Sequence, residues 1–262
     1  MNIKNIYRSQ AIAILTYHSL DDSGSVLSVS PRVFAEHMEA LTELDAEVVG
    51  IMEIQRRVRQ VGASKPIVAI TFDDGFSNVF EYGFPILQRY GFPATVFLVT
   101  DYCGKSNAWP SQPTGIPYQP LLNWKEIRTM SDAGISFGSH TRTHPDLTII
   151  PIDEVEDELI GSKKAIEDAI GQSVDAFAYP YGSFHERIKK LTQAYFTVAC
   201  STSLGFVHTG SDFFNLDRLD MYYMRRSGVL KHLFSPSVGY YIRLRRIMRS
   251  IRGHTPALGR RR

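Results

Sequence analysis

The chain has 262 residues, of which 44% are hydrophobic and 21% charged, so it can bury one large core or two small ones. This composition excludes a low-complexity chain, and no stretch approaches the roughly 18 apolar residues that span a bilayer. The net charge of +2 hides an asymmetry, because the residues from Met221 on hold 11 Lys or Arg and no Asp or Glu, and the residues before them hold 18 basic and 27 acidic groups. The two cysteines, Cys103 and Cys200, lie far apart, and we expect two free thiols.

Short apolar segments alternate along the chain with longer amphipathic ones. Most of the short segments are continuously apolar, which is typical of strands covered on both faces, and they predict strands at residues 11–17, 67–72, 94–99, 135–138, 176–179 and 196–200. Apolar residues at helical spacing predict helices at residues 31–44, 78–90, 123–133, 152–170 and 184–194. This alternation indicates parallel strands with helices outside, in a barrel or in an open doubly wound sheet. In either fold, ligand chemistry gathers at the carboxyl ends of the strands.

Two adjacent carboxylates end the strand predicted at residues 67–72. Asp73 and Asp74 stand in the segment Thr-Phe-Asp-Asp-Gly, and like charges there repel unless a cation or hydrogen bonds compensate them. Gly75 lets the chain turn sharply away. The alternative is an ordinary polar turn, since Asp-Asp-Gly is common turn chemistry. This segment alone does not separate the two interpretations.

Two histidines four residues apart follow the strand predicted at residues 135–138. His140 and His144 can converge on one ion, and neutral imidazole suits Zn, Co, Ni or Fe. The alternative is a pair of surface-loop histidines. A carboxylate from the first cluster would complete three protein ligands with open positions for water. Because both clusters end strands, we expect a metal site.

Two weaker signals also follow predicted strands. In the segment Ala-Tyr-Pro-Tyr-Gly, Pro180 and Gly182 favour a tight turn that can aim a backbone N–H into a site. His18 closes the first predicted strand, where a lone histidine is more often structural. Its functional interpretation therefore depends on the other clusters.

The segments TFDDG, SHTRTH and AYPYG, in this order and spacing, resemble the polysaccharide deacetylase (NodB-homology) family, carbohydrate esterase family 4. The resemblance runs from about residue 11 to residue 218. It implies an α/β fold, a distorted (β/α) barrel with about seven strands. It also implies a hydrolase that removes N- or O-acetyl groups from sugar polymers with a divalent metal, commonly zinc.

Carried over residue by residue, the resemblance implies a metal site and a catalytic base. Asp74, His140 and His144 match the family's metal ligands, and Asp73 matches its general base. Tyr181 matches the residue whose backbone N–H helps to hold the oxyanion.

Two departures from the family pattern concern acid–base groups. Ala178 replaces the Arg of the third motif that orients the base, and near the C-terminus no convincing Leu-x-His motif supplies the usual general acid, for which His208 and His232 are the candidates. The early Tyr-His pair resembles a permuted branch that includes poly-N-acetylglucosamine deacetylases, in which an N-terminal strand carries the catalytic His and the third motif also lacks the Arg. On this similarity His18 is the expected acid, with a structural histidine as the alternative. Arg218 lies where relatives often carry an Arg near the last strand, and we assign it no role.

Substrate contacts are expected from Pro180, Tyr181 and the long loop at residues 103–122, since loops at this end of a barrel shape specificity. Trp109 in that loop is a candidate for stacking on a sugar ring, whereas Trp124 in a helical segment is expected to pack. The predicted function is a metal-dependent deacetylase that hydrolyses the acetyl amide or ester of an N-acetylated sugar in a polysaccharide or other glycan. The alternatives are an amidohydrolase acting on a lipid-linked or small-molecule amide, and a non-catalytic carbohydrate-binding relative.

The C-terminal segment differs from the rest in charge and pattern. We predict a catalytic domain at residues 1–235 and a basic amphipathic tail at residues 236–262, which suits an anionic membrane surface. The alternatives are a solvated helix over the barrel and a disordered end. The acidic body and the absence of a recognition motif predict no nucleic-acid partner. The apolar run at residues 11–15 is too short for a signal peptide, and we expect a cytoplasmic protein, peripheral at the inner membrane face.

Overall fold

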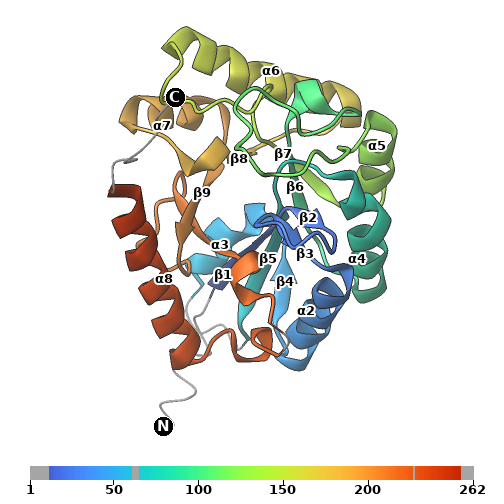
Figure 1. Cartoon of the computed structure of the whole chain (residues 1–262), viewed down its shortest axis with the longest axis vertical. Helices are drawn as coiled ribbons and strands as arrows, with labels where there is room; N and C mark the ends of the chain where they lie inside the picture. Colours follow the sequence, from blue (N-terminus) through green and yellow to red (C-terminus); the bar gives the residue numbers. More distant parts are fainter. Residues whose placement is uncertain (1–11, 61–64, 227, 255–262) are drawn as a thin grey trace.

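The computed structural model describes residues 12–60, 65–226 and 228–254, and a closed barrel of parallel strands lies at its centre (Figure 1). Seven strands within these residues form the barrel, in the order β1 (Ile12–Tyr17), β5 (Ile67–Phe72), β6 (Thr95–Leu98), β7 (Ser136–Ser139), β8 (Ala176–Ala178), β9 (Val198–Leu204) and β10 (Leu216–Asp220). The first strand pairs with both β5 and β10, which closes the ring. The predicted seven-stranded barrel is confirmed, and the open sheet is excluded.

The six predicted strands are present, although residue 11 lies outside the described residues. Two strands of the large sheet were not predicted: β10, and β4 (Glu47–Val49), which pairs with the amino-terminal half of β5. The sequence of β10, Leu-Asp-Arg-Leu-Asp, mixes charged and apolar residues, so it lacks the continuous apolar run that marks the other barrel strands. Two short strands, β2 (Ser19–Leu20) and β3 (Ser28–Val29), form a separate small sheet.

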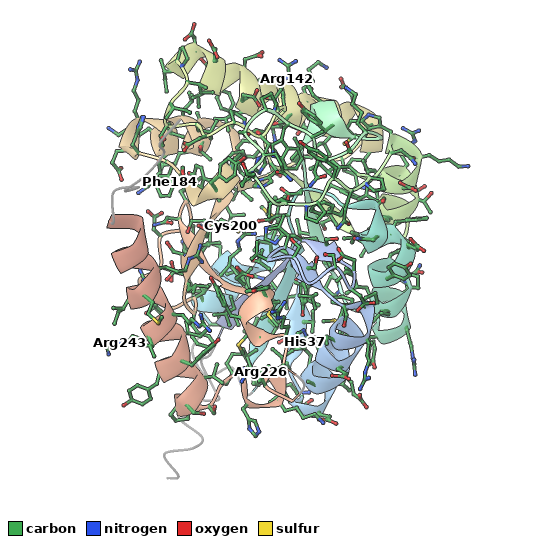
Figure 2. All side chains as sticks on the ribbon, in the orientation of Figure 1. His37, Arg142, Phe184, Cys200, Arg226 and Arg243 are labelled. Carbon is green, nitrogen blue, oxygen red and sulfur yellow. The ribbon has the colours of Figure 1, made fainter. Side chains whose placement is uncertain are left out.

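The barrel strands pack against two apolar clusters, one inside the barrel and one between the strands and the outer helices. Alternate residues of each strand point inward, since successive side chains lie on opposite faces. The inward residues at the amino ends form one buried cluster, which includes Ile14, Ala69, Phe97 and Cys200 (Figure 2 labels Cys200). The outward residues pack with the helices in a second, larger cluster. Both cysteines are free, as predicted, because Cys200 is enclosed by the barrel and Cys103 lies in a loop.

Helices cover the outside of the barrel. The α-helices are α2 (Pro31–Glu43), α3 (Ile54–Val58), α4 (Phe84–Tyr90), α5 (Trp124–Asp132), α6 (Ile152–Ile170), α7 (Glu186–Tyr195) and α8 (Pro236–His254). The predicted helix 78–90 is divided into a π-helical turn, η2 (Val79–Gly83), and α4. Pro85 lies in the first turn of α4 and has no N–H to donate to the preceding turn, which accounts for the irregularity. The other helical predictions agree with the structure within two residues.

The last helix, α8, packs along β9 beside the barrel (Figure 1). Val238 and Ile242 are its buried contacts, whereas Arg243 lies on its outer side (Figure 2). No helix among the described residues is both long enough and apolar enough to cross a bilayer. The predicted tail thus begins as a helix on the barrel, and residues 255–262 lie outside the described residues.

Candidate active site

The inward rows of the barrel become polar at the carboxyl ends of three strands. The rows are Ile12, Ile14, Thr16 and His18 along β1, Ile67, Ala69, Thr71 and Asp73 along β5, and Leu216, Arg218 and Asp220 along β10. The strand register places these rows side by side: Thr16 is level with both Thr71 and Asp220. The polar residues therefore meet above an apolar barrel floor. The period-2 pattern of a strand continues into the site.

Three candidate metal ligands converge at this end of the barrel: Asp74, His140 and His144. Asp74 Oδ1 lies 3.5 Å from His140 Nε2 and 3.4 Å from His144 Nε2, and all three residues are buried. Two ligands of one tetrahedral zinc, each bonded at about 2.0–2.1 Å, lie about 3.3 Å apart. The two distances from Asp74 are close to this value, all three donor atoms lie within 4.8 Å of one another, and the N, N, O donor set suits a single Zn, Co, Ni or Fe ion. The structure brings together the three residues that the sequence analysis selected.

Hydrogen bonds orient both imidazoles toward this point. His140 Nδ1 lies 2.7 Å from the Ala178 carbonyl oxygen, and His144 Nδ1 lies 3.1 Å from the Tyr181 hydroxyl, which donates to the Ser111 carbonyl at 2.8 Å. These partners favour a proton on each Nδ1 and so present the Nε2 lone pair to a cation. Burial lowers the pKa of His144 well below its ordinary value, which keeps this imidazole neutral and able to bind a metal.

Unusual backbone conformations gather around the same residues. Five non-glycine residues of the described chain have positive φ, and four of them lie in the site: Asp74, Thr141, His144 and Tyr181, with φ of 69°, 72°, 58° and 58°. Each such conformation costs of order 1–3 kcal/mol unless neighbouring contacts stabilise it. One such contact is the His144 N–H, which donates to Thr141 Oγ1 at 3.0 Å. The fold thus maintains energetically unfavourable backbone conformations that orient these side chains, as is typical of functional sites.

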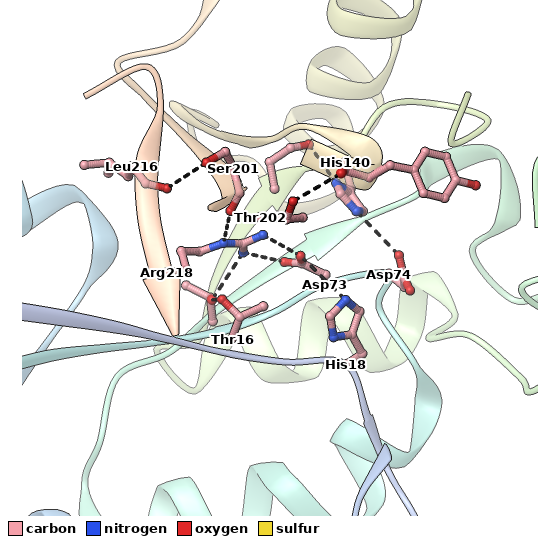
Figure 3. A network of polar contacts seen from close by, with 12 residues as sticks. Thr16, His18, Asp73, Asp74, His140, Ser201, Thr202, Leu216 and Arg218 are labelled. Atoms are coloured by element: carbon pink, nitrogen blue, oxygen red, sulfur yellow. Dashed lines mark hydrogen bonds and ion pairs between the residues drawn. The ribbon is translucent and has the colours of Figure 1, made fainter. Parts of the chain in front are cut away.

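Asp73 and Arg218 form a buried, bidentate ion pair beside the candidate metal ligands (Figure 3). Arg218 Nη1 and Nη2 donate to the two Asp73 carboxylate oxygens at 2.8 and 2.6 Å, and Arg218 Nε donates to the Ser201 carbonyl at 2.9 Å. Burial alone would raise the pKa of the Asp73 carboxyl, but the guanidinium overrides this effect and holds the pKa well below its ordinary value. Asp73 is therefore a carboxylate whose orientation is set by Arg218.

Arg218 is the residue that the sequence analysis left without a role. The family's third-motif Arg is absent, and Ala178 at that position supplies only its carbonyl, to His140. Arg218 reaches Asp73 from a different strand and makes the contact that Ala178 cannot make. Its contact with Asp73 was not predicted, because β10 was not predicted. An alternation of inward residues at 216, 218 and 220 was the available signal.

His18 lies on the opposite side of Asp73 from Arg218 (Figure 3). Its Nε2 is 3.9 Å from Asp73 Oδ2, and its side chain is 21% exposed at the pocket. Neither His208 nor His232 lines this pocket, and both are exposed. Of the three histidines compared as candidates for the general acid, His18, His208 and His232, His18 is the one that lines the pocket. Asp220 also lines the pocket, and burial raises the pKa of its carboxyl.

A pocket of about 470 Å³ opens over these residues, and loop residues complete its wall. Trp109 lines it but is 2% exposed, and its ring stacks on His144 with centroids 4.5 Å apart. The observed contact of Trp109 is thus with a ligand candidate, and its stacking on a sugar stays a prediction. Tyr181 lines the pocket, whereas Pro180 is buried and does not line it. Trp124 packs against the core as expected.

One residue of α8 also reaches the pocket. Arg249 lines it, and its Nη1 donates to the Thr202 carbonyl of β9 at 3.1 Å. The helix that begins the predicted tail is therefore part of the pocket wall. The boundary predicted at residue 235 remains a prediction.

Comparisons with known proteins identify related sequences. A family model described as polysaccharide deacetylase matches residues 60–198. The Bacillus subtilis protein YxkH, named as a polysaccharide deacetylase, is 28% identical over 70% of this chain and 61% of its own length. A Staphylococcus aureus poly-β-1,6-N-acetyl-D-glucosamine N-deacetylase is 26% identical over 61% of this chain and 55% of its own length. The matches thus span less than two thirds of these curated relatives.

Solved structures share the barrel. The Streptococcus pyogenes deacetylase PplD, in complex with acetate, superposes with a TM-score of 0.70 at 23% identity, over 81% of this chain and 92% of that one. BC0361, a polysaccharide deacetylase from Bacillus cereus, superposes with a TM-score of 0.69 at 28% identity, over 85% of this chain and 68% of that one. Since the family model covers more than half of the residues and the same barrel recurs in these structures, the chain belongs to the polysaccharide deacetylase family.

Proposed function

We propose that this protein is a metal-dependent hydrolase that removes the acetyl group from an N-acetylated sugar in a polysaccharide or other glycan. The observation that carries the proposal is the convergence of Asp74, His140 and His144 at one point, with the Asp73 carboxylate next to them. The name of the Staphylococcus aureus relative supports an acetyl amide as the bond that is cleaved.

The test is acetate release from a panel of N- and O-acetylated oligosaccharides and lipid-linked sugars, before and after chelation and with metal added back. We expect release that stops on chelation and returns with zinc. Glycan binding without any release would instead indicate a non-catalytic carbohydrate-binding relative. Release from lipid-linked or small amides alone would indicate the amidohydrolase alternative.

The groups that converge at the pocket can divide the chemical steps of this reaction among them. A divalent cation held by Asp74, His140 and His144 would supply Lewis-acid chemistry, polarising a carbonyl and lowering the pKa of water toward neutral. Asp73, held as a carboxylate by Arg218, takes a proton from the attacking water. The Tyr181 backbone N–H donates to the oxygen that gains negative charge. His18 protonates the departing nitrogen, a role for which imidazole is suited near neutral pH. The C–N bond breaks, and acetate and a free amine leave.

Replacement of His18 with alanine is expected to lower kcat about 10²–10⁴-fold, because the leaving nitrogen then lacks its proton donor. The purified variant should keep its metal, since His18 is not one of the three converging side chains. The loss of kcat should be smaller with 4-nitrophenyl acetate as the substrate, because its leaving group departs without a proton. His208→Ala, an exposed histidine outside the pocket, is the matched control. Full activity of His18→Ala on acetylated sugars would assign the acid elsewhere.

We propose further that α8 contacts an anionic membrane surface. Tyr240, Leu244, Ile247 and Met248 are 75%, 57%, 50% and 38% exposed and recur at helical spacing, and the same helix carries arginines and no acidic residue. Apolar side chains and arginines on one exposed helix are complementary to an anionic lipid surface. The cytoplasmic location, peripheral at the inner membrane face, remains a prediction that cell fractionation tests.

The double variant Leu244→Asp and Ile247→Asp is expected to lose flotation with anionic liposomes, because it places charge in the apolar row. Met52→Asp, also at an exposed apolar residue but away from α8, is the matched control. The two substitutions of the double variant leave the buried contacts of α8 unchanged, so the pocket wall is preserved. Equal flotation of the double variant and the wild type would refute membrane contact through this helix.

A further inference from the structure

Arg249 is an exposed cation in the pocket wall. Its Nη1 donates only to the Thr202 carbonyl, and no carboxylate of the described residues forms an ion pair with it. The nearby arginines of α8 are engaged differently: Arg246 pairs with Asp217 at 3.0 Å, and Arg245 lies over the Tyr223 ring at 4.9 Å. Arg249 therefore keeps most of its five N–H donors for a group that enters the pocket.

None of the described carboxylates that line the pocket forms an ion pair with Arg249. The Asp73 carboxylate is already matched by Arg218, and Asp74 faces the two imidazoles. Asp220 is half-buried and attracts Arg249 electrostatically, but the two side chains do not form an ion pair within 4.0 Å. Arg249 thus presents a guanidinium without an ion pair at the α8 end of the pocket.

Hydrogen bonds connect Arg249 to the part of the pocket in which the candidate metal ligands lie. Arg249 donates to the carbonyl of Thr202, and Thr202 Oγ1 donates to the Tyr181 carbonyl at 3.2 Å. Tyr181 in turn is hydrogen-bonded to the ligand candidate His144. One intervening residue, Thr202, therefore separates Arg249 from the Tyr181 loop. A pocket of about 470 Å³ has room for an amino sugar and a small substituent.

Resting on the proposed function, we propose that Arg249 forms an anion subsite. The substrate is then an N-acetylated sugar that carries a phosphate or carboxylate group beside the acetylated position. Planar guanidinium suits both groups, because its N–H donors can bind two oxygens at once. A phosphate would come from a sugar phosphate or a lipid-linked sugar, and a carboxylate from an acidic sugar substituent.

Acetate release by wild type, Arg249→Gln and Arg246→Gln tests the subsite. Arg246 is the matched control, since it lies on the same helix and does not line this pocket. The substrates are a neutral N-acetylglucosamine oligosaccharide, N-acetylglucosamine 1-phosphate and N-acetylmuramic acid, and the last two distinguish phosphate from carboxylate. We expect Arg249→Gln to lose about 10- to 100-fold in kcat/KM, through KM, on an anionic sugar and to change the neutral one less than about 2-fold. Equal losses on neutral and anionic sugars, or no loss, would overturn the subsite.

A binding arm separates failure of the subsite from failure of the proposed function. Calorimetry compares N-acetylglucosamine 1-phosphate with N-acetylglucosamine on the protein as purified, in wild type and in Arg249→Gln. We expect wild type to bind the phosphate form about 10-fold or more tightly, and Arg249→Gln to lose this preference. If acetate is released from none of the sugars but this preference is present, the deacetylase proposal fails and the subsite stands. A wild type without the preference refutes the subsite whatever the activity.

Discussion

Replacement of His140 with alanine is expected to remove the bound metal and to lower acetate release below detection. His140 Nε2 is one of three converging donors, and the remaining pair, Asp74 and His144, leaves a cation with two protein ligands instead of three. The loss is expected to exceed that of an acid–base residue, because the attacking water and the acetyl carbonyl both lose their activating group. Metal analysis of the purified variant, together with an acetate assay, measures both effects.

Two controls separate loss of metal from loss of fold. His140 is buried and contacts the Ala178 carbonyl, so the circular dichroism spectrum and the thermal midpoint of the variant are measured alongside. His208→Ala is expected to keep wild-type metal content, because this histidine is exposed and outside the pocket. A folded His140→Ala protein that holds one metal per chain and releases acetate would exclude the proposed ligand set.

Replacement of Arg218 with methionine is expected to lower both turnover and stability. Asp73 would become a buried carboxylate without its partner, and breaking such a pair costs about 3–5 kcal/mol of the free energy of unfolding. Turnover should fall about 10²–10⁴-fold, since the base would lose its orientation and its charged state. Denaturant unfolding and kcat measure the two effects, and metal content should be unchanged because Arg218 is not a ligand candidate.

Two further variants show whether Arg218 acts through Asp73. The double variant Asp73→Asn and Arg218→Met should recover most of the lost stability but none of the turnover, because it removes the unpaired charge together with the base. Arg218→Lys keeps the positive charge but cannot bind both carboxylate oxygens in parallel, so it should recover stability more than turnover. If Arg218→Met had wild-type turnover, Arg218 would be a structural residue only.

The metal ligand set was predictable because each of its members stands in a short local pattern. Asp74 follows an apolar run that ends in TFDDG, and His140 and His144 follow another that ends in SHTRTH. In a parallel barrel all strands end at the same rim, so residues just after two strands lie near one another whatever the details of packing. The same local logic predicted six barrel strands and the helices between them.

The partner of Asp73 depends instead on contacts between distant segments. Arg218 is 145 residues away in the sequence, and its pairing requires that the barrel closes between β1 and β10 and that β10 has the register which turns residue 218 inward. Closure and register arise from backbone hydrogen bonds between strands, and a single strand's side-chain pattern does not specify its neighbour. Likewise, helical spacing predicted α8 as a basic amphipathic segment, whereas its packing on β9 determines that Arg249 reaches the pocket. Local residue pattern was thus sufficient for the ligands, and long-range strand pairing was needed for the groups that orient and surround them.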